Sequence, residues 1–351
     1  MRNLISRIID AEDDMEIAGK AMNGVFAVKK LESLKPDVVI LDLEMPEMDG
    51  IGFLKERQRL GYDMPVVILS SHAQKGARIT MEALSLGAAD FLMKPSDTGG
   101  QDLDQLGKLL VQTVRAYGLQ YRRGKGGKAP AVTRRPAEVE RKEQKREPGL
   151  PAASFGGRPA GRIEIVALGI STGGPNALRS VFPALRTDFP VPVVVVQHMP
   201  PGFTREFARS LDRVCPLDVK EAEDGDVLKP GRVLIAPGNR QLEIVQRKLA
   251  RIVALSDAPP VNGHRPSVGV LFRSVSEVYG GNALAVIMTG MGKDGAREIG
   301  EIYNKGGMTL GQDEDSSIVY GMPRVAWELG FIQRVVSLGD MADTLNTLVG
   351  S

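Results

Sequence analysis

Three short polar segments of the chain carry the residue types of a hydrolytic site. Ser171 stands in the run Ser-Thr-Gly-Gly-Pro, His198 in Gln-His-Met-Pro-Pro and Asp294 in Met-Gly-Lys-Asp-Gly. A serine hydroxyl becomes a good nucleophile when a histidine takes its proton, and a carboxylate orients that histidine and stabilises its charged form. The three residue types therefore predict a Ser-His-Asp triad, provided that the fold brings them together.

Each segment also has a simpler interpretation when it is taken alone. The turn at Ser171 is compatible with a phosphate-binding or a purely structural turn, and a lone histidine is more often structural. Asp294 could be the N-cap of a helix over 296–303. The chain order Ser, His, Asp also differs from the three orders familiar from hydrolases. The prediction depends on the coincidence of the three residues.

The scarcity of histidine narrows the choice of a catalytic base. The chain contains three histidines, His72, His198 and His264. A base near neutral pH is commonly a histidine, because its pKa lies close to that range. We expect His72 to be exposed in a polar loop, and His264, in a Pro-rich loop, to line a cleft or bond locally. His198 is the predicted base.

The elements that must position these residues are short apolar runs typical of buried strands. One such run precedes each polar segment and a helical pattern follows it, which indicates a parallel sheet. Sites in such sheets form at the carboxyl edge of the strands, so the three side chains should meet there. The runs are Ile163–Ile170, Val191–Val196 and Ala283–Met288. Three shorter strands between them predict an antiparallel insertion, at Arg232–Ala236, Gln241–Ile244 and Arg251–Ala254.

The first part of the chain has the same alternation of strands and helices. Between it and the second part lies a stretch rich in Lys, Arg, Glu, Gly and Pro, which cannot bury enough surface to offset its ordering entropy. We expect one domain over 1–118, a flexible charged linker over 119–161 and a second domain over 162–351. A nucleic-acid arm is the alternative for the linker, but its glutamates and lack of aromatics argue against it. The first-domain strands are predicted at Val38–Leu41, Val66–Leu69 and Ala89–Met93.

Composition excludes several classes of protein. The net charge of +2 on 351 residues gives no indication of nucleic-acid or membrane binding. No apolar run approaches the roughly 20 residues that span a bilayer, and the first residues form an amphipathic helix with acidic residues. Cys215 is the single cysteine, which excludes an internal disulfide and fits a reducing compartment. We expect a cytoplasmic protein without membrane insertion.

The motifs of the second domain closely resemble those of the chemotaxis protein-glutamate methylesterases of the CheB type. The resemblance extends from Ile163 nearly to the end of the chain and implies a doubly wound, mostly parallel α/β domain that needs no cofactor. It departs from the family pattern at Gly269, where an acidic residue is expected. The matching runs are GISTGGPNAL, QHMPPGFTREFA, KEAEDGD, PPVNGHRPSV, MTGMGKDGA and YGMPR.

The resemblance implies a role for each motif residue. Ser171 would be the nucleophile, His198 the base and Asp294 its orienting carboxylate. Thr172 and Met291 would border the site, Met291 through its backbone N–H. The implied reactions are hydrolysis of γ-glutamyl methyl esters on methyl-accepting chemotaxis proteins, with release of methanol, and deamidation of receptor glutamines.

The first domain resembles a response-regulator receiver of the (βα)5 type. The resemblance implies that Asp42 accepts a phosphoryl group from the histidine kinase of the pathway, with Mg²⁺ as the metal. Ser70 would sense this group and Lys94 would contact it. The pattern lacks the first strand of a receiver and the acidic pair that ends it, so Mg²⁺ binding is in doubt and Asp42 is the only candidate ligand.

Two explanations of the missing strand stay open. Met1 is either an internal methionine of a chain about a dozen residues longer, or the receiver is degenerate. Asp13 and Asp14 do not replace the acidic pair, because they precede a second strand expected at Met15–Ala21. Two other functions also stay open: a triad hydrolase of a different chemosensory-like pathway, and a non-catalytic binding module switched by phosphorylation.

Overall fold

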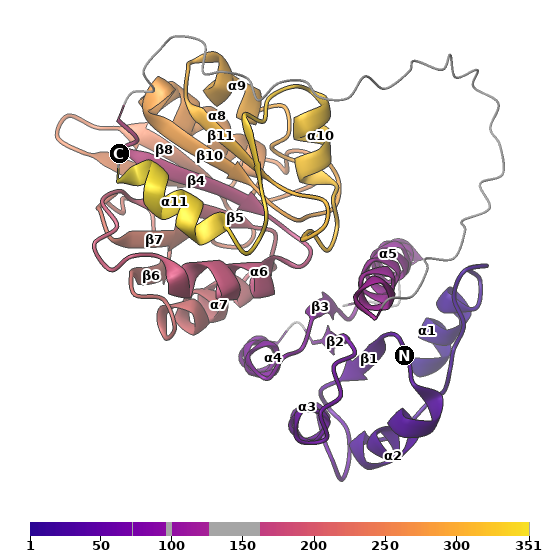
Figure 1. Cartoon of the computed structure of the whole chain (residues 1–351). Coiled ribbons are helices and arrows are strands. Elements are labelled where there is room, and N and C mark those ends of the chain that lie inside the picture. Colours follow the sequence, from indigo (N-terminus) through magenta and orange to yellow (C-terminus); the bar gives the residue numbers. More distant parts are fainter. Residues whose placement is uncertain (72, 96–99, 126–161, 351) are drawn as a thin grey trace, which may run out of the picture.

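The computed structural model describes residues 1–71, 73–95, 100–125 and 162–350. They form two α/β bodies, each built on its own parallel sheet (Figure 1). The predicted fold class, a receiver-type domain followed by a mostly parallel α/β domain, is confirmed. Most of the expected linker lies outside the described residues. Within them, helix α5 (Gly100–Gly124) continues past position 119.

The N-terminal body has a three-stranded parallel sheet of order β1-β2-β3 among the described residues. The strands confirm the three predicted in this domain: β1 (Val39–Asp42), β2 (Val66–Ser70) and β3 (Asp90–Met93). All five residues of the central strand are buried, as expected when helices cover both faces of a sheet. The other helices of this body are α1 (Arg2–Ile9), α2 (Gly24–Leu34), α3 (Gly50–Arg59) and α4 (Gln74–Ser85).

The strand predicted at Met15–Ala21 is wrong. This segment forms no ladder with β1, so β1 is an edge of the sheet in the part of the chain that the structure describes. A strand requires a partner for its backbone N–H and C=O groups, and sequence pattern alone does not supply one. A cavity of about 720 Å³ lies between this segment, β1 and helices α1, α2 and α5.

The C-terminal body is built on a seven-stranded parallel sheet of order β12-β11-β10-β4-β5-β7-β6. The three strands predicted to carry the site lie side by side at its centre and are entirely buried. They are β4 (Ile165–Ile170), β5 (Val193–Gln197) and β10 (Ala283–Ile287). The outer strands are β6 (Asp218–Glu221), β7 (Arg232–Ile235), β11 (Met308–Gln312) and β12 (Arg334–Val336).

The predicted three-stranded antiparallel insertion is partly wrong. Strand β7 pairs in parallel with β5, inside the main sheet. Its residues Val233, Leu234 and Ile235 are completely buried, which suits a strand covered on both faces. Only β8 (Gln241–Gln246) and β9 (Arg251–Ser256) form an antiparallel hairpin.

Helices cover the two faces of this sheet. On one face, Leu178 of α6 and Phe207 of α7 belong to one buried cluster, and on the other, Phe272 of α8 belongs to a second. The helices are α6 (Gly174–Val181), α7 (Phe203–Asp212), α8 (Val268–Tyr279), α9 (Ile299–Asn304), α10 (Met322–Glu328) and α11 (Met341–Val349), with short 3-10 turns at Phe182–Ala184 and Gly280–Asn282.

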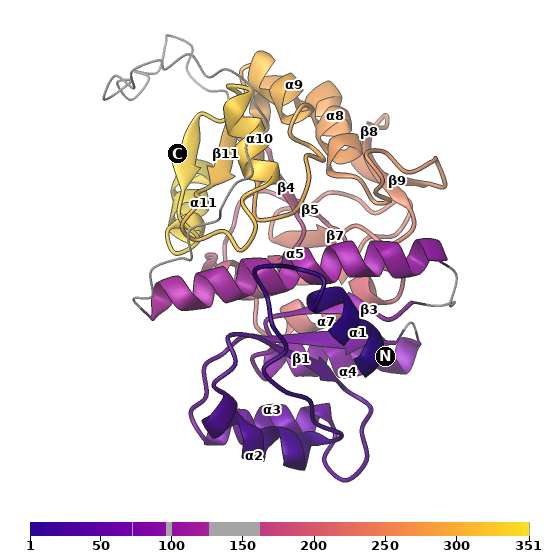
Figure 2. The same cartoon turned by 90° about the vertical axis from the view of Figure 1, so that its right-hand side faces the viewer.

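Figure 2 shows the N-terminal body below the C-terminal body. The two bodies touch where the residues leading into β3 meet the start of α6. The Asn176 side-chain amide donates to the carbonyls of Ala88 and Ala89, both at 2.9 Å. The Phe91 ring stacks on that of Phe203, with centroids 5.1 Å apart. Helices α4 and α7 also pack together. The N-terminal body therefore lies against the C-terminal body close to the predicted nucleophile.

Candidate active site

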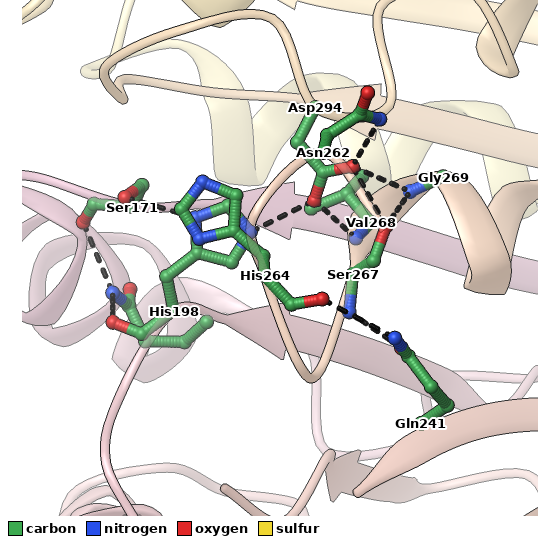
Figure 3. A network of polar contacts seen from close by, with 10 residues as sticks. Ser171, His198, Gln241, Asn262, His264, Ser267, Val268, Gly269 and Asp294 are labelled. Carbon is green, nitrogen blue, oxygen red and sulfur yellow. Dashed lines mark hydrogen bonds and ion pairs between the residues drawn. The ribbon is translucent and has the colours of Figure 1, made fainter. Parts of the chain in front are cut away.

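Adjacent strands bring the three predicted triad residues to one edge of the large sheet (Figure 3). Strand β4 leads into Ser171, β5 into His198 and β10 into the turn that holds Asp294. The first two strands pair in parallel in a register that sets Ile170 opposite Gln197. Ser171 and His198, which follow these two residues, are thus neighbours just beyond the strand ends. The structure places all three side chains together.

The histidine ring bridges the hydroxyl and the carboxylate. His198 Nδ1 lies 3.1 Å from Ser171 Oγ, and Nε2 lies 2.9 Å from Asp294 Oδ2. Since an ionised carboxylate only accepts hydrogen bonds, the neutral ring carries its proton on Nε2 and donates it to Asp294. Nδ1 is then free to accept the serine proton, as a general base must.

The Asp294 carboxylate is buried and has several donors. Only 1% of its side chain is exposed. It accepts hydrogen bonds from Ser267 Oγ at 2.7 Å, Val268 N at 2.7 Å and Asn262 Nδ2 at 3.1 Å. Burial raises the pKa of Asp294, but hydrogen bonds from His198 and from the Ser267 and Asn262 side chains outweigh it, and the pKa is about 2. The carboxylate therefore stays ionised at neutral pH.

The turn after β4 depends on two glycines. Gly173 has a φ of 79°, in the left-handed region that favours glycine. A Cβ on Gly174 would lie 1.9 Å from Gln197 Oε1, so the Gln197 side chain would have to move to admit it. The Gln197 Nε2 group donates to the Ser171 carbonyl at 3.0 Å and fixes the nucleophile turn. Sequence reasoning missed Gln197, although it directly precedes the predicted base.

The two predicted supporting residues, Thr172 and Met291, lie on segments that come close to Ser171. The Thr172 carbonyl accepts a hydrogen bond from Thr289 Oγ1 at 3.0 Å. A Cβ on Gly290 would lie 2.8 Å from Ser171 Cβ, so the backbone leading into Met291 packs directly on the serine. Among the described residues, the Met291 N–H has no acceptor, which leaves it available to a developing oxyanion. Both supporting roles stay predictions.

A second histidine lies on the base. The His264 ring stacks on that of His198 with centroids 3.6 Å apart and planes 4° apart. Burial and the neighbouring His198 lower the pKa of His264 to about 4. The sequence predicted that His264 lines a cleft or bonds locally, and the stacking on His198 was not anticipated. His72 lies outside the described residues.

The presence of glycine at position 269, where an acidic residue was expected, has a steric explanation. A Cβ there would lie 2.9 Å from the Glu298 carboxylate. The Gly269 N–H donates to Ser267 Oγ at 3.1 Å, within the donor network of the triad carboxylate. Glu298, just before α9, fills the space that an acidic side chain at position 269 would need.

The predicted receiver residues also come together. Lys94 Nζ lies 2.7 Å from Asp42 Oδ2 at the carboxyl edge of the small sheet. The Ser70 hydroxyl shares a 2.7 Å hydrogen bond with Thr80 Oγ1. Asp42, Ser70 and Lys94 line the same small pocket. Their roles in phosphorylation stay predictions.

The residues present do not fit the Mg²⁺ site that a receiver implies. In the described ranges, no group of three or more His, Cys, Asp or Glu side chains could hold a metal ion. Asp42 is paired with Lys94, and Asp14 is held by Arg115 at 2.7 Å. None of the helices in these same ranges is long and apolar enough to cross a membrane.

Comparisons with known proteins identify both domains. A model of the CheB methylesterase family matches residues 166–345, and a response regulator receiver domain model matches residues 1–102. The chain belongs to the CheB methylesterase family. This confirms the resemblance drawn from the motifs and identifies the chain as an enzyme with a receiver domain.

Whole-length relatives and a solved structure agree with this membership. The protein-glutamate methylesterase/protein-glutamine glutaminase of Treponema denticola is 52% identical over 351 residues, which cover 99% of this chain and 94% of that protein. The protein of the same name from Treponema pallidum is 46% identical, with the same coverage of both chains. The crystal structure of the Thermotoga maritima CheB methylesterase catalytic domain is 40% identical, with a TM-score of 0.52, and covers 53% of this chain and 99% of that one.

Proposed function

We propose that this cytoplasmic enzyme hydrolyses γ-glutamyl methyl esters on chemoreceptors and deamidates receptor glutamines during chemotaxis adaptation. The observation that carries the proposal is the unbroken hydrogen-bonded chain from Ser171 through His198 to Asp294. The names of the relatives supply the substrate class, a glutamate ester or glutamine side chain on a protein.

The proposed reaction begins at the hydroxyl. Ser171 Oγ attacks the side-chain carbonyl carbon of the ester while its proton passes to His198 Nδ1. The resulting imidazolium is stabilised by Asp294, and the Met291 N–H is positioned to bind the developing oxyanion. When the intermediate collapses, the C–O bond to methoxide breaks, and His198 returns the proton to give methanol.

The second half of the reaction restores the enzyme. Water attacks the acyl-enzyme carbonyl and gives a proton to His198 Nδ1. The bond from the carbonyl carbon to Ser171 Oγ then breaks, and His198 returns this proton to Oγ. The glutamate carboxylic acid that is released loses its remaining proton to solvent. A glutamine side chain follows the same path, with ammonia as the leaving group. One triad therefore serves both reactions.

The receiver is proposed to inhibit the esterase until Asp42 is phosphorylated by the histidine kinase of the pathway. In support, Asp90 of the receiver accepts a hydrogen bond at 2.8 Å from the N–H of Gly173, two residues after the nucleophile. The contact places a receiver carboxylate against the helix N-terminus beside Ser171, where a substrate oxyanion would be stabilised. Lys94 and Ser70 are the proposed switch residues.

Methanol release from methylated receptor tests the proposal. Ser171→Ala should lower turnover at least about a thousandfold, because the nucleophile is lost. Ser180→Ala is a matched control, since Ser180 is exposed on α6, the helix that follows Ser171, and should act like the wild type. Methanol release by Ser171→Ala at the wild-type rate would refute the triad.

A serine-reactive fluorophosphonate separates the competing functions. A triad hydrolase is labelled at Ser171, whereas a non-catalytic binding module is not. Labelling without methanol release would instead indicate a triad hydrolase of a different pathway.

A further inference from the structure

We propose that His264 is a positioning residue of the esterase, whose neutral ring stacks on His198 and holds the plane of the catalytic imidazole. The inference rests on the proposed triad and adds to it a residue that touches the base but not the reacting atoms. The contact is visible in Figure 3, where the two imidazole rings overlie each other.

The hydrogen bonds of His198 leave one motion weakly restrained. They hold the ring at two edges, through Nδ1 and Nε2. Bonds of this kind resist sliding within the ring plane better than tilting out of it, because hydrogen bonds tolerate some angular distortion. A parallel ring at a centroid distance of 3.6 Å blocks such tilting on the face that it covers.

The loop that carries His264 is itself fixed to the triad. The backbones of Val261 and His264 exchange two hydrogen bonds, at 2.9 and 3.0 Å, around a tight turn. The same turn presents Asn262, which donates to Asp294. Gln241 Nε2 donates to the His264 carbonyl at 3.2 Å. One short loop therefore positions both the base, by stacking, and the carboxylate, by hydrogen bonding.

Stacking, not hydrogen bonding, is the contact that His264 makes through its side chain. Its ring nitrogens have no hydrogen-bond partner among the described residues, so it is not a second base for Ser171. A neutral ring face attracts the imidazolium that forms on His198 during turnover, whereas a second positive charge would repel it. The role therefore requires a ring that is flat and uncharged.

The surroundings keep His264 neutral. Burial has the largest effect and lowers the pKa of His264 to about 4, together with the neighbouring His198 and against the opposing effect of the Asp294 carboxylate. The adjacent Arg265 directs its guanidinium away, to Asn239 Oδ1 and the carbonyl of Asp257. His264 is therefore uncharged throughout the range in which a histidine base works.

Three substitutions in the full-length chain separate the effects of the ring, its charge and its size on activity. His264→Phe keeps a neutral ring, His264→Ala removes it, and His264→Lys adds a positive charge. For His264→Ala we expect kcat to fall about tenfold to a hundredfold with little change in KM, because misplacing a base affects the chemical step. His264→Phe should stay within about threefold of the wild type, since it restores the stack.

The pH dependence of Ser171 labelling by the fluorophosphonate gives a second measurement. It would not change if His264 had only a structural role. The labelling rate falls at low pH as the base becomes protonated. His264→Lys should shift this fall to lower pH, because a nearby positive charge disfavours protonation of His198. His264→Phe should leave it in place. Melting temperatures check folding, and His264→Gln replaces His264→Ala if that variant unfolds.

Two results would overturn the inference: wild-type kinetics in His264→Ala, or equal impairment of His264→Phe and His264→Ala, which would assign the role to a ring nitrogen. Failure of the proposed function is distinguishable, because the wild-type chain itself would then release no methanol from receptor or resist labelling at Ser171.

Discussion

His198 turns Nδ1 toward the nucleophile and Nε2 toward the carboxylate, the reverse of the order in the familiar serine proteases. The strand register explains this. Ser171 and His198 follow directly paired residues on neighbouring strands, so the hydroxyl lies close to the histidine backbone. Nδ1, the ring nitrogen nearer that backbone, reaches it, and Nε2 points outward to Asp294.

The first prediction belongs to this residue scale and concerns the triad carboxylate. Asp294→Asn should lower kcat about ten-thousandfold, because an amide can donate to Nε2 and favour the wrong tautomer of His198. Asp343→Asn, on the exposed face of α11, is the matched control. Methanol release measures both. A loss below tenfold for Asp294→Asn would indicate that the carboxylate does not orient the base.

The same carboxylate gives a stability effect of known sign. Its pKa of about 2 lies below the ordinary value of 3.8, so ionised Asp294 stabilises the folded chain above that value. This stabilisation is lost as the pH falls through about 2. Loss of activity above pH 4 therefore does not come from protonation of Asp294.

At the scale of elements, the turn after β10 is packed closely against the nucleophile. A Cβ on Gly290 would lie 2.8 Å from Ser171 Cβ and 2.5 Å from Met322 Sδ. Gly290→Ala should therefore destabilise the domain by about 1–3 kcal/mol and slow Ser171 labelling more than about tenfold.

Thermal unfolding and fluorophosphonate labelling measure this effect. Gly339→Ala is the control, because its new Cβ would meet nothing nearer than Ser337 Oγ at 3.8 Å. Equal behaviour of the two variants would contradict the packing argument.

The strands that carry the site were predictable because their amino-acid composition indicates that they are buried. Strands β4, β5 and β10 are continuous apolar runs, typical of strands buried on both faces, and each ends in a polar segment. Strand β12 escaped prediction because two of its three residues are exposed. The pairing of strand β7 was also not predicted. It pairs with β5 in the main sheet, and its own few residues do not indicate which strand it pairs with.

The same limit applies to the site. The clustering of Ser171, His198 and Asp294 was predictable because each residue follows a recognisable strand. Two contacts could not be predicted, because each joins segments far apart in the chain and no local sequence pattern indicates it. They are the stacking of His264 on His198 and the hydrogen bond between Asp90 and Gly173. Met15–Ala21 was misassigned for a related reason, since a strand-like composition does not provide a partner strand.

At the scale of the whole molecule, docking of the receiver on the esterase should depend on pH. Burial raises the pKa of Asp90 to about 6, against the opposing effect of the Gly173 N–H. In separated domains the pKa should return toward its ordinary value near 4. The docked state thus binds a proton more readily, so this contribution to docking is complete below about pH 4 and is lost as the pH rises through about 6.

The ratio of full-length activity to that of residues 162–351 should therefore increase between about pH 5 and about pH 7, by at most about a hundredfold. Asp90→Asn keeps an acceptor for the Gly173 N–H but cannot ionise, so it should flatten this dependence and lower basal activity at neutral pH. A pH-independent ratio in the wild type would contradict the prediction. Deleting residues 1–155 should raise basal activity, and an unchanged rate would count against inhibition by the receiver.

The unpaired side of β1 has a consequence for how the protein behaves at high concentration. In the described residues no strand covers that side, and β1 lines the large cavity beside α5. An unpaired strand edge is a template for pairing with another strand. At high concentration, molecules should therefore associate through the N-terminal body while the triad remains intact. Activity should then be measured over a dilution series, because a single concentration does not separate inhibition by the molecule's own receiver from inhibition by contact with a second molecule.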